Sequence, residues 1–109
     1  MIYLASPYSH PEPCIREARY EAACRATAAF VRAGHPVYCP IVHSHPLARF
    51  GLPTDWAFWE VFDRAHLRNC EQLVVLMLRG WRESECLRAE VQIAIELELP
   101  VSYLGPEGC

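Results

Sequence analysis

The stretch QLVVLML (residues 72–78) constrains the fold most, because every residue from Leu73 to Leu78 is apolar. A strand with water on one face alternates apolar and polar residues, whereas a strand covered on both faces is apolar throughout. Sheets covered on both faces are typically parallel, and parallel strands need long connections that usually contain a helix. This one stretch therefore predicts a parallel sheet with helices on both faces.

Segments of strand and helix character alternate along the rest of the chain. Strands are expected at residues 1–6, 36–42, 72–78 and 99–105, helices at 14–35, 55–70 and 85–96, and an irregular stretch at 43–56. This alternation indicates right-handed βαβ units. We expect an α/β fold in three layers, with a small parallel sheet between helices. A chain of 109 residues leaves little room for a second core, which favours a single domain over residues 1–109.

Composition and charge exclude several classes of partner. The formal net charge is −3 and no lysine- or arginine-rich run is present, so we expect no nucleic-acid partner. No apolar run approaches the ~20 residues of a membrane span, so we expect no membrane partner. The six cysteines form no CxxC pair and follow no signal-peptide pattern, which favours reduced thiols in the cytoplasm. A small ligand with one phosphate fits this charge balance.

Ligands of such sheets bind beyond the carboxyl ends of the strands. Four connections lie at that edge: residues 6–13, 41–54, 79–84 and 104–109. Ser6, Ser9 and His43 belong to the first two and are candidate ligand contacts. His43 and His45 could form part of a zinc site with Cys39, but their spacing fits no zinc module, so we expect no metal.

Glu90 is a misfit on its predicted helix. Residues three and four apart share a helix face, so Leu87, Glu90, Val91 and Ala94 form one stripe that is otherwise apolar. One interpretation is a border position from which the carboxylate reaches water. The other is a carboxylate held in a cleft, where its surroundings tune it as a base or a nucleophile.

Asp63 is a second misfit, because helical spacing aligns it with Trp56 and Trp59. A salt bridge to Arg64 or Arg68, or a position at the border of the stripe, would explain this placement without any function. Two carboxylates on apolar stripes of one small chain also resemble the acid and nucleophile pair of glycosidic-bond chemistry. Sequence spacing leaves both interpretations open.

The helix expected at residues 55–70 is apolar nearly all round, since Phe58 and Phe62 lie on a different side from Trp59. A helix of this kind is usually buried on both sides. We expect its second side to lie in a subunit interface or to line a base-stacking pocket, with Trp59 as a candidate ligand contact. On this basis the chain is expected to form a homodimer or homotetramer.

Ser84 directly precedes the helix that carries Glu90 and can cap it. Free amides at a helix N-terminus also suit a phosphate or a sugar hydroxyl, which makes Ser84 a candidate ligand contact. The chain contains no GxGxxG or Walker pattern, so this segment is no standard dinucleotide or triphosphate site.

Several motifs together resemble a known family. The segments IYLASPYSH, CPIVHSHPLA and GLPTDWAFWEVFDRAHLRNCEQLVVLMLRGW, then S-x5-E-x3-A and LPV, are similar to those of the DUF1937 group over nearly the whole chain. That group is related to the nucleoside 2-deoxyribosyltransferase superfamily. The resemblance implies a flavodoxin-like fold and a helix glutamate that attacks the anomeric carbon of a deoxyribose.

Carried over by this resemblance, Glu90 is the nucleophile, Tyr3 orients it and Asp63 assists proton transfer at the leaving base. Ser84 matches a serine that contacts the 5′-phosphate in the nucleotide hydrolase branch. The implied function is hydrolysis or transfer at the N-glycosidic bond of a (deoxy)nucleoside or its 5′-monophosphate, and this chemistry needs no metal or organic cofactor.

A rival hypothesis from another class is a non-catalytic nucleotide-binding module, such as a sensor or a partner subunit. In that case Glu90 accepts a hydrogen bond from a ribose hydroxyl. The segment ECLRA favours this rival, because it is bulkier and more charged than the glycine-rich segment of the hydrolase branch.

Overall fold

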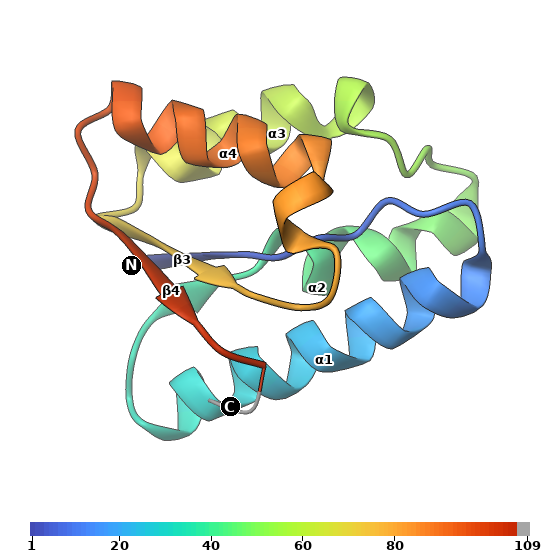
Figure 1. Ribbon diagram of the computed structural model, residues 1–109, viewed down its shortest axis with the longest axis horizontal. Helices are drawn as coiled ribbons and strands as arrows, with labels where there is room; N and C mark the ends of the chain where they lie inside the picture. Colours follow the sequence, from blue (N-terminus) through green and yellow to red (C-terminus); the bar gives the residue numbers. More distant parts are fainter. Residues whose placement is uncertain (107–109) are drawn as a thin grey trace.

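A computed structural model describes residues 1–106 and shows one sheet of four parallel strands between two layers of helices (Figure 1). The strands are β1 (Ile2–Ala5), β2 (Val37–Tyr38), β3 (Gln72–Leu76) and β4 (Val101–Leu104). The helices are α1 (Pro13–Arg32), α2 (Pro40–Leu47), α3 (Trp56–Arg68) and α4 (Glu85–Glu96), with short 3-10 turns at Ala48–Phe50 and Trp81–Glu83.

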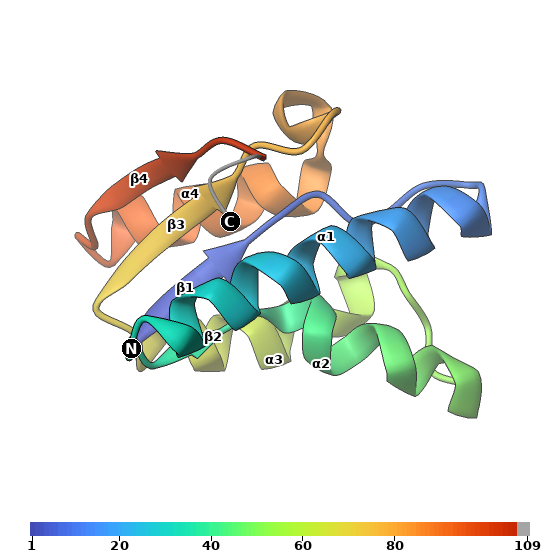
Figure 2. The ribbon, with the colours of Figure 1, turned by 90° about the horizontal axis from the view of Figure 1, so that it is seen from below.

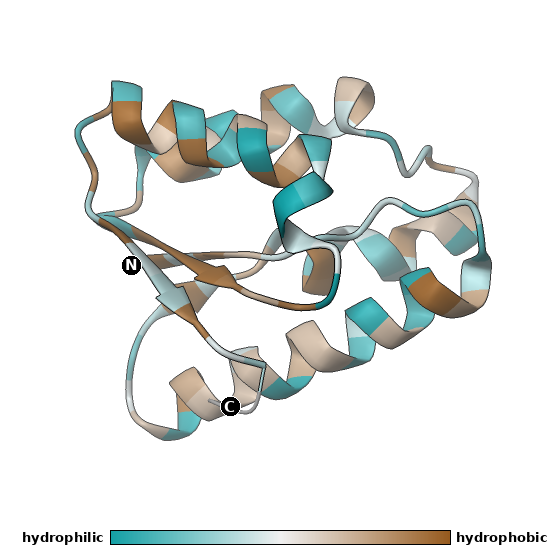
Figure 3. Ribbon diagram, viewed as in Figure 1, coloured by the Kyte–Doolittle hydropathy of each residue, from teal (hydrophilic) through white to brown (hydrophobic). Residues whose placement is uncertain are grey.

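The strands lie in the order β2-β1-β3-β4, which Figure 2 shows side by side. This order matches the first four positions of flavodoxin-like sheets. The expected α/β fold with a parallel sheet between helix layers is therefore confirmed. Figure 3 shows β3 as hydrophobic along its arrow, while α3 and α4 alternate between hydrophobic and hydrophilic residues.

The core has two halves, one on each face of the sheet. Ile2 and Leu4 of β1 pack on the side of α1 and α2, whereas Tyr3 and Ala5 pack on the side of α3 and α4. Successive strand residues point to opposite faces, so a strand between two helix layers must be apolar on both. Tyr3 breaks that rule through its hydroxyl, which lies on the α3 and α4 side.

The second strand is shorter than the sequence predicted. Only Val37 and Tyr38 pair with β1, and α2 begins at Pro40, within the stretch expected to be strand. Proline suits the first turn of a helix, because its missing N–H has no intrahelical partner there. Ile41 is buried on the face of α2 that meets the core. The irregular stretch predicted at residues 43–56 is helical at 43–50, where that prediction was wrong, and irregular at 51–55 as predicted.

Residues 1–106 contain no membrane-spanning helix and no disulfide. Within residues 1–106, no helix combines the length and apolarity that a bilayer crossing requires. The five cysteines of that part of the chain are all free. The sixth, Cys109, and the end of the 104–109 connection lie outside the described residues.

Helix α3 leaves apolar side chains at the surface. Val61 and Phe62 are 66% and 48% exposed, and the rings of Phe58 and Phe62 lie 5.7 Å apart. Burial of a large apolar side chain stabilises by up to ~3 kcal/mol, so several exposed on one helix favour a protein partner. We propose that this face of α3 meets its own copy in a homodimer or homotetramer.

Replacement of Phe62 by glutamate is expected to dissociate that oligomer, because two carboxylates would be buried against each other. Light scattering at micromolar concentration measures the mass, and the variant should give the 12.5 kDa of a monomer. Val31→Glu, at a 62% exposed apolar position on α1, is the matched control and should keep the wild-type mass. A monomeric wild type would refute the oligomer, and an unchanged mass in the Phe62 variant would move the interface elsewhere.

Candidate active site

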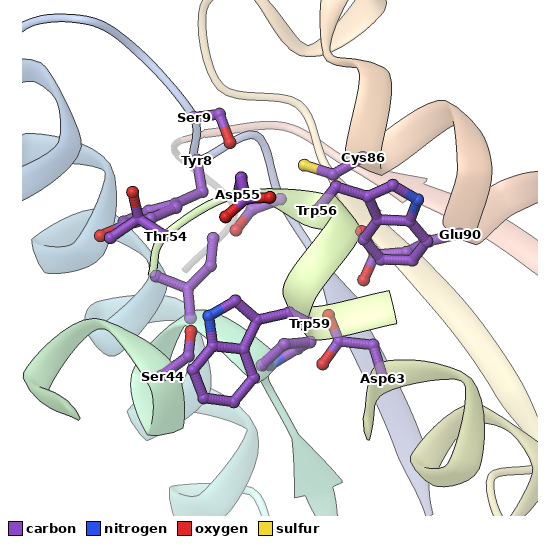
Figure 4. A pocket seen from close by; sticks show the side chains of 13 residues that line it. Tyr8, Ser9, Ser44, Thr54, Asp55, Trp56, Trp59, Asp63, Cys86 and Glu90 are labelled. Atoms are coloured by element: carbon purple, nitrogen blue, oxygen red, sulfur yellow. The ribbon is translucent and has the colours of Figure 1, made fainter. Parts of the chain in front are cut away.

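A narrow pocket lies between the segment that follows β1 and the helices α2, α3 and α4 (Figure 4). Asp63 of α3 and Glu90 of α4 both line it, together with the indoles of Trp56 and Trp59. Its cavity volume is about 40 Å³, which is room for a few water molecules. We call it the inner pocket.

A more open hollow of about 340 Å³ adjoins the inner pocket and shares Ser9, Thr54 and Asp55 with it. His10 and Pro11 complete its lining. Sites for small organic ligands usually measure about 300–1,000 Å³, so an organic ligand at the carboxylates has to extend into this hollow. The inner pocket and the hollow together form the cleft.

Glu90 is held in the core side of α4. It is only 4% exposed, and Leu87 and Ala94 on the same face are buried too. The Tyr3 hydroxyl donates a hydrogen bond of 2.5 Å to Oε2 of Glu90, from a side chain that is itself fully buried. The interpretation of Glu90 as a border residue that reaches water is therefore wrong.

Asp63 is buried as well, with 7% of its surface exposed. Within the described residues it makes no ion pair, and Arg64 pairs instead with Glu60 at 2.9 Å. The salt bridge and the border position are therefore both wrong as explanations of Asp63. Its placement is set by α3, which buries Asp63 and Leu67 on one face and packs beside α4.

Burial changes the proton affinity of both carboxyl groups. The pKa of Glu90 rises to about 8, mainly because burial disfavours its charged form and further because of the charge on Asp63, while the Tyr3 hydrogen bond lowers it. Burial raises the pKa of Asp63 to about 7. Near neutral pH the pair therefore retains a proton, so one group can act as an acid while the other is a carboxylate.

Three further predicted residues lie in the same lining. Ser6 is 3% exposed, and its Oγ has no hydrogen-bond partner within residues 1–106. Ser9 lies at the junction of inner pocket and hollow. Trp59 lines the inner pocket while its Nε1 donates to the Pro53 carbonyl at 2.8 Å.

The structure does not bring every predicted residue to the inner pocket. His43 is exposed and lies edge-on to Trp59, with ring centroids 6.4 Å apart, but it is not part of the lining. Ser84 caps α4 as predicted, because its Oγ accepts from the Leu87 amide at 3.3 Å, and it too lies outside the lining. Tyr3 stands behind Glu90 rather than in the cavity wall.

The histidines and Cys39 do not gather. Across residues 1–106, no three His, Cys, Asp or Glu side chains are placed to hold a metal ion. Cys39 is buried. His45 instead bonds to Tyr8 Oη through Nδ1 at 2.6 Å and to Glu17 through Nε2 at 2.5 Å.

Cys86 and Tyr8 are among the lining residues of the inner pocket that sequence reasoning did not predict as site residues. Cys86 lines it from α4, four residues before Glu90, and this helical spacing was a signal that could have found it. Tyr8 lines it from the segment after β1. Its link to His45 spans 37 positions in the chain, so no local pattern could have indicated it.

Comparison with known families identifies the chain. The model of DUF1937, described as a domain of unknown function, matches residues 1–105. The chain belongs to the DUF1937 family. No curated protein matches it. The buried carboxyl groups of Asp63 and Glu90 in one pocket are the feature of this DUF1937 protein that bears on an activity.

The raised pKa of Glu90 makes a prediction about stability. An unfolded glutamate titrates near pH 4.3, whereas Glu90 in the folded protein titrates near 8. Between these values the folded state binds the extra proton, so the Glu90 contribution to stability is lost as pH rises through this window. Relative to wild type, Glu90→Gln should therefore be more favourable for stability at pH 9 than at pH 5, by about 4 kcal/mol.

Denaturant unfolding at both pH values measures this difference. Glu96→Gln, at an exposed position of the same helix, is the matched control and should shift stability equally at pH 5 and pH 9. An equal shift for the Glu90 variant at the two pH values would show that its carboxyl does not titrate abnormally.

Proposed function

We propose that this DUF1937 protein cleaves or transfers the N-glycosidic bond of a (deoxy)nucleoside or its 5′-monophosphate. The observation that carries the proposal is the pair of buried carboxylates, Asp63 and Glu90, in one pocket lining, with Tyr3 bonded to one of them. The link to the nucleoside 2-deoxyribosyltransferase superfamily is part of the proposal and rests on the sequence resemblance.

In the first step, a carboxylate oxygen of Glu90 attacks the anomeric carbon of the sugar. The bond from that carbon to the base nitrogen breaks, and its electron pair leaves with the base. Asp63 gives its proton to the departing base, which leaves neutral. Tyr3 holds Oε2 of Glu90, so the other oxygen is free to attack. The product of this step is a sugar ester of Glu90.

In the second step, Asp63 accepts a proton from water, and the resulting hydroxide attacks the anomeric carbon. The ester bond breaks and Glu90 leaves as a carboxylate, which the Tyr3 hydroxyl stabilises. A second base in place of water would complete a transfer reaction. Asp63 therefore gives one proton to the base in the first step and regains another from water in the second, which restores its starting state.

The first step needs the shared proton on Asp63 rather than on Glu90. Their pKa values, about 7 and about 8, differ by about one. Moving the proton to Asp63 therefore costs little beside the barrier of such a reaction. The chemistry needs no metal or organic cofactor.

Other polar and aromatic groups suit the rest of the ligand. Trp56 and Trp59 offer ring faces for a base. The Ser6 hydroxyl, buried and without a partner in the described residues, is assigned to a sugar hydroxyl. Ser84 at the start of α4 is assigned to a 5′-phosphate, and Ser9 to the mouth of the inner pocket.

A cytoplasmic location is part of the proposal, since nucleosides and nucleotides are abundant there and five thiols are free. His43, beside Trp59 but outside the pocket lining, is assigned to the edge of a bound base.

One observation favours the rival, a non-catalytic nucleotide-binding module. The raised pKa of Glu90 leaves it largely protonated at pH 7 in the free protein. A protonated carboxyl is a poor nucleophile but a good partner for a ribose hydroxyl. Release of free base, measured by chromatography over a panel of nucleosides and 5′-monophosphates, separates the two functions. Binding without base release would favour the module.

Glu90→Gln should lower base release by at least ~1,000-fold, because the amide keeps the shape but is no nucleophile. Binding of the substrate should stay within a few-fold, as measured by calorimetry. Glu96→Gln on the same helix serves as the control with unchanged turnover. If the Glu90 variant keeps activity within a few-fold of wild type, Glu90 is not the nucleophile.

Asp63→Asn should lower turnover by about 100- to 10,000-fold for poor leaving groups and much less for good ones, because only poor ones need a proton to depart. The kcat/KM values for a series of nucleosides with bases of different acidity measure this dependence. An equal loss for every base would assign Asp63 a structural role.

A further inference from the structure

A second cavity lies on the α1 side of the sheet and has a volume of about 560 Å³. Its lining comes from α1, from His10 after β1 and from residues 78–80 after β3. It shares no residue with the inner pocket and only His10 with the outer hollow. Adjacent strands β1 and β3 form the switch point of this sheet order, where parallel sheets commonly bind ligands.

The charged residues of this lining are all basic. Arg19, Arg79 and His10 line the cavity, and no acidic residue does so among the described ones. The chain as a whole carries a net charge of −3, so this concentration of basic groups runs against its overall balance. An anion would meet attraction here that most of the surface does not offer.

Arg19 is partly buried without a counter-ion. Its guanidinium donates to the carbonyls of Tyr8 at 3.3 Å, Ser9 at 3.0 Å and Arg79 at 3.2 Å. In residues 1–106 it makes no ion pair, and burial lowers its pKa. A partly buried charge without an opposite charge loses part of its hydration, and a bound anion would offset that loss.

Gly80 allows the guanidinium of Arg19 to lie close to the backbone of residues 79–80. This glycine has a φ of 88°, and a Cβ there would lie 2.8 Å from Nη2 of Arg19. Any other residue would be strained and would push the guanidinium away. An arginine has five N–H donors, and Arg19 uses three of them on the carbonyls. The others remain for a ligand in the cavity.

The rest of the lining is apolar and adjoins the basic groups. It consists of Ile15, Ala18 and Ala22 on α1 and Leu78 after β3. Such a surface suits an apolar or aromatic body, while guanidinium groups suit the oxygens of phosphate or carboxylate. We infer that this cavity binds an organic oxyanion, a phosphate or carboxylate on an apolar body, at a site that shares only His10 with the cleft.

Nuclear magnetic resonance titration of the ¹⁵N-labelled chain tests this inference with phenyl phosphate, benzoate and neutral phenol. Saturable shifts are expected for amides of residues 15–22 and 78–80, with phenol at least ~10-fold weaker, since a charge-assisted bond is lost. The stronger of the two anions identifies the preferred oxyanion. Shifts confined to the amides of Trp56, Asp63 and Glu90 would place the anion in the cleft and overturn the inference.

Arg79→Gln is the informative variant, because only the backbone carbonyl of Arg79 takes part in holding Arg19. Loss of one exposed cation should weaken phenyl phosphate about 3-fold or more. Arg25→Gln removes the same charge from an exposed position on α1 outside the lining, and should change the affinity less than the Arg79 variant. If both variants weaken phenyl phosphate binding equally, the two arginines act only through long-range attraction of the anion, and the inference that Arg79 lines the binding site is overturned.

Absence of saturable shifts at about 10 mM, where even a weak site would fill, would also overturn the inference. The test needs no turnover, so it is independent of the proposed function. A chain that binds the anions but releases no base would keep this site and refute the glycosidic activity.

Discussion

The hydrogen bond between Tyr3 and Glu90 is the interaction on which the cleft depends. Tyr3 lies in β1, which has a strand on either side, and Glu90 lies on the face of α4 that covers the sheet. A buried hydroxyl and a buried carboxyl each destabilise the fold when left without a partner. Each is the partner of the other, so the bond fixes α4 over β1 and leaves the remaining carboxyl oxygen available at the pocket.

A second buried carboxyl group, that of Asp63, further lowers the free energy of unfolding. Burial raises the pKa of both carboxyl groups. At neutral pH the free energy of unfolding is therefore lower than it would be with apolar residues of similar size at these positions. A domain of this size has only about 5–15 kcal/mol of stability in total. A purely structural role could be filled by apolar residues that destabilise the fold less, so the pair is better explained by the proposed acid and nucleophile roles.

The sequence predicted what depends on local periodicity and missed what depends on distant contacts. The apolar run of β3 indicated the parallel sheet, and helical spacing marked Glu90 and Asp63 as misfits on buried stripes, which they are. The strand expected up to residue 42 failed because Pro40 can begin a helix as readily as end a strand. The bonds of His45 to residues 28 and 37 positions away follow from the packing of α2 on α1, which no local pattern encodes.

The same distant contacts govern how the cleft can admit a ligand. With a cavity volume of about 40 Å³, the inner pocket has to widen before a sugar reaches Glu90. Its lining comes from α3 and α4, from Thr54 and Asp55 before α3, and from α2, which forms one side together with Tyr8. That side is held by Tyr8, His45 and Glu17, bonded in series, and by the stacking of His45 on Tyr20 with centroids 4.3 Å apart. Widening on this side would break the Tyr8–His45 bond or move α2 together with Tyr8, so it would act through residues that take no part in the proposed chemistry.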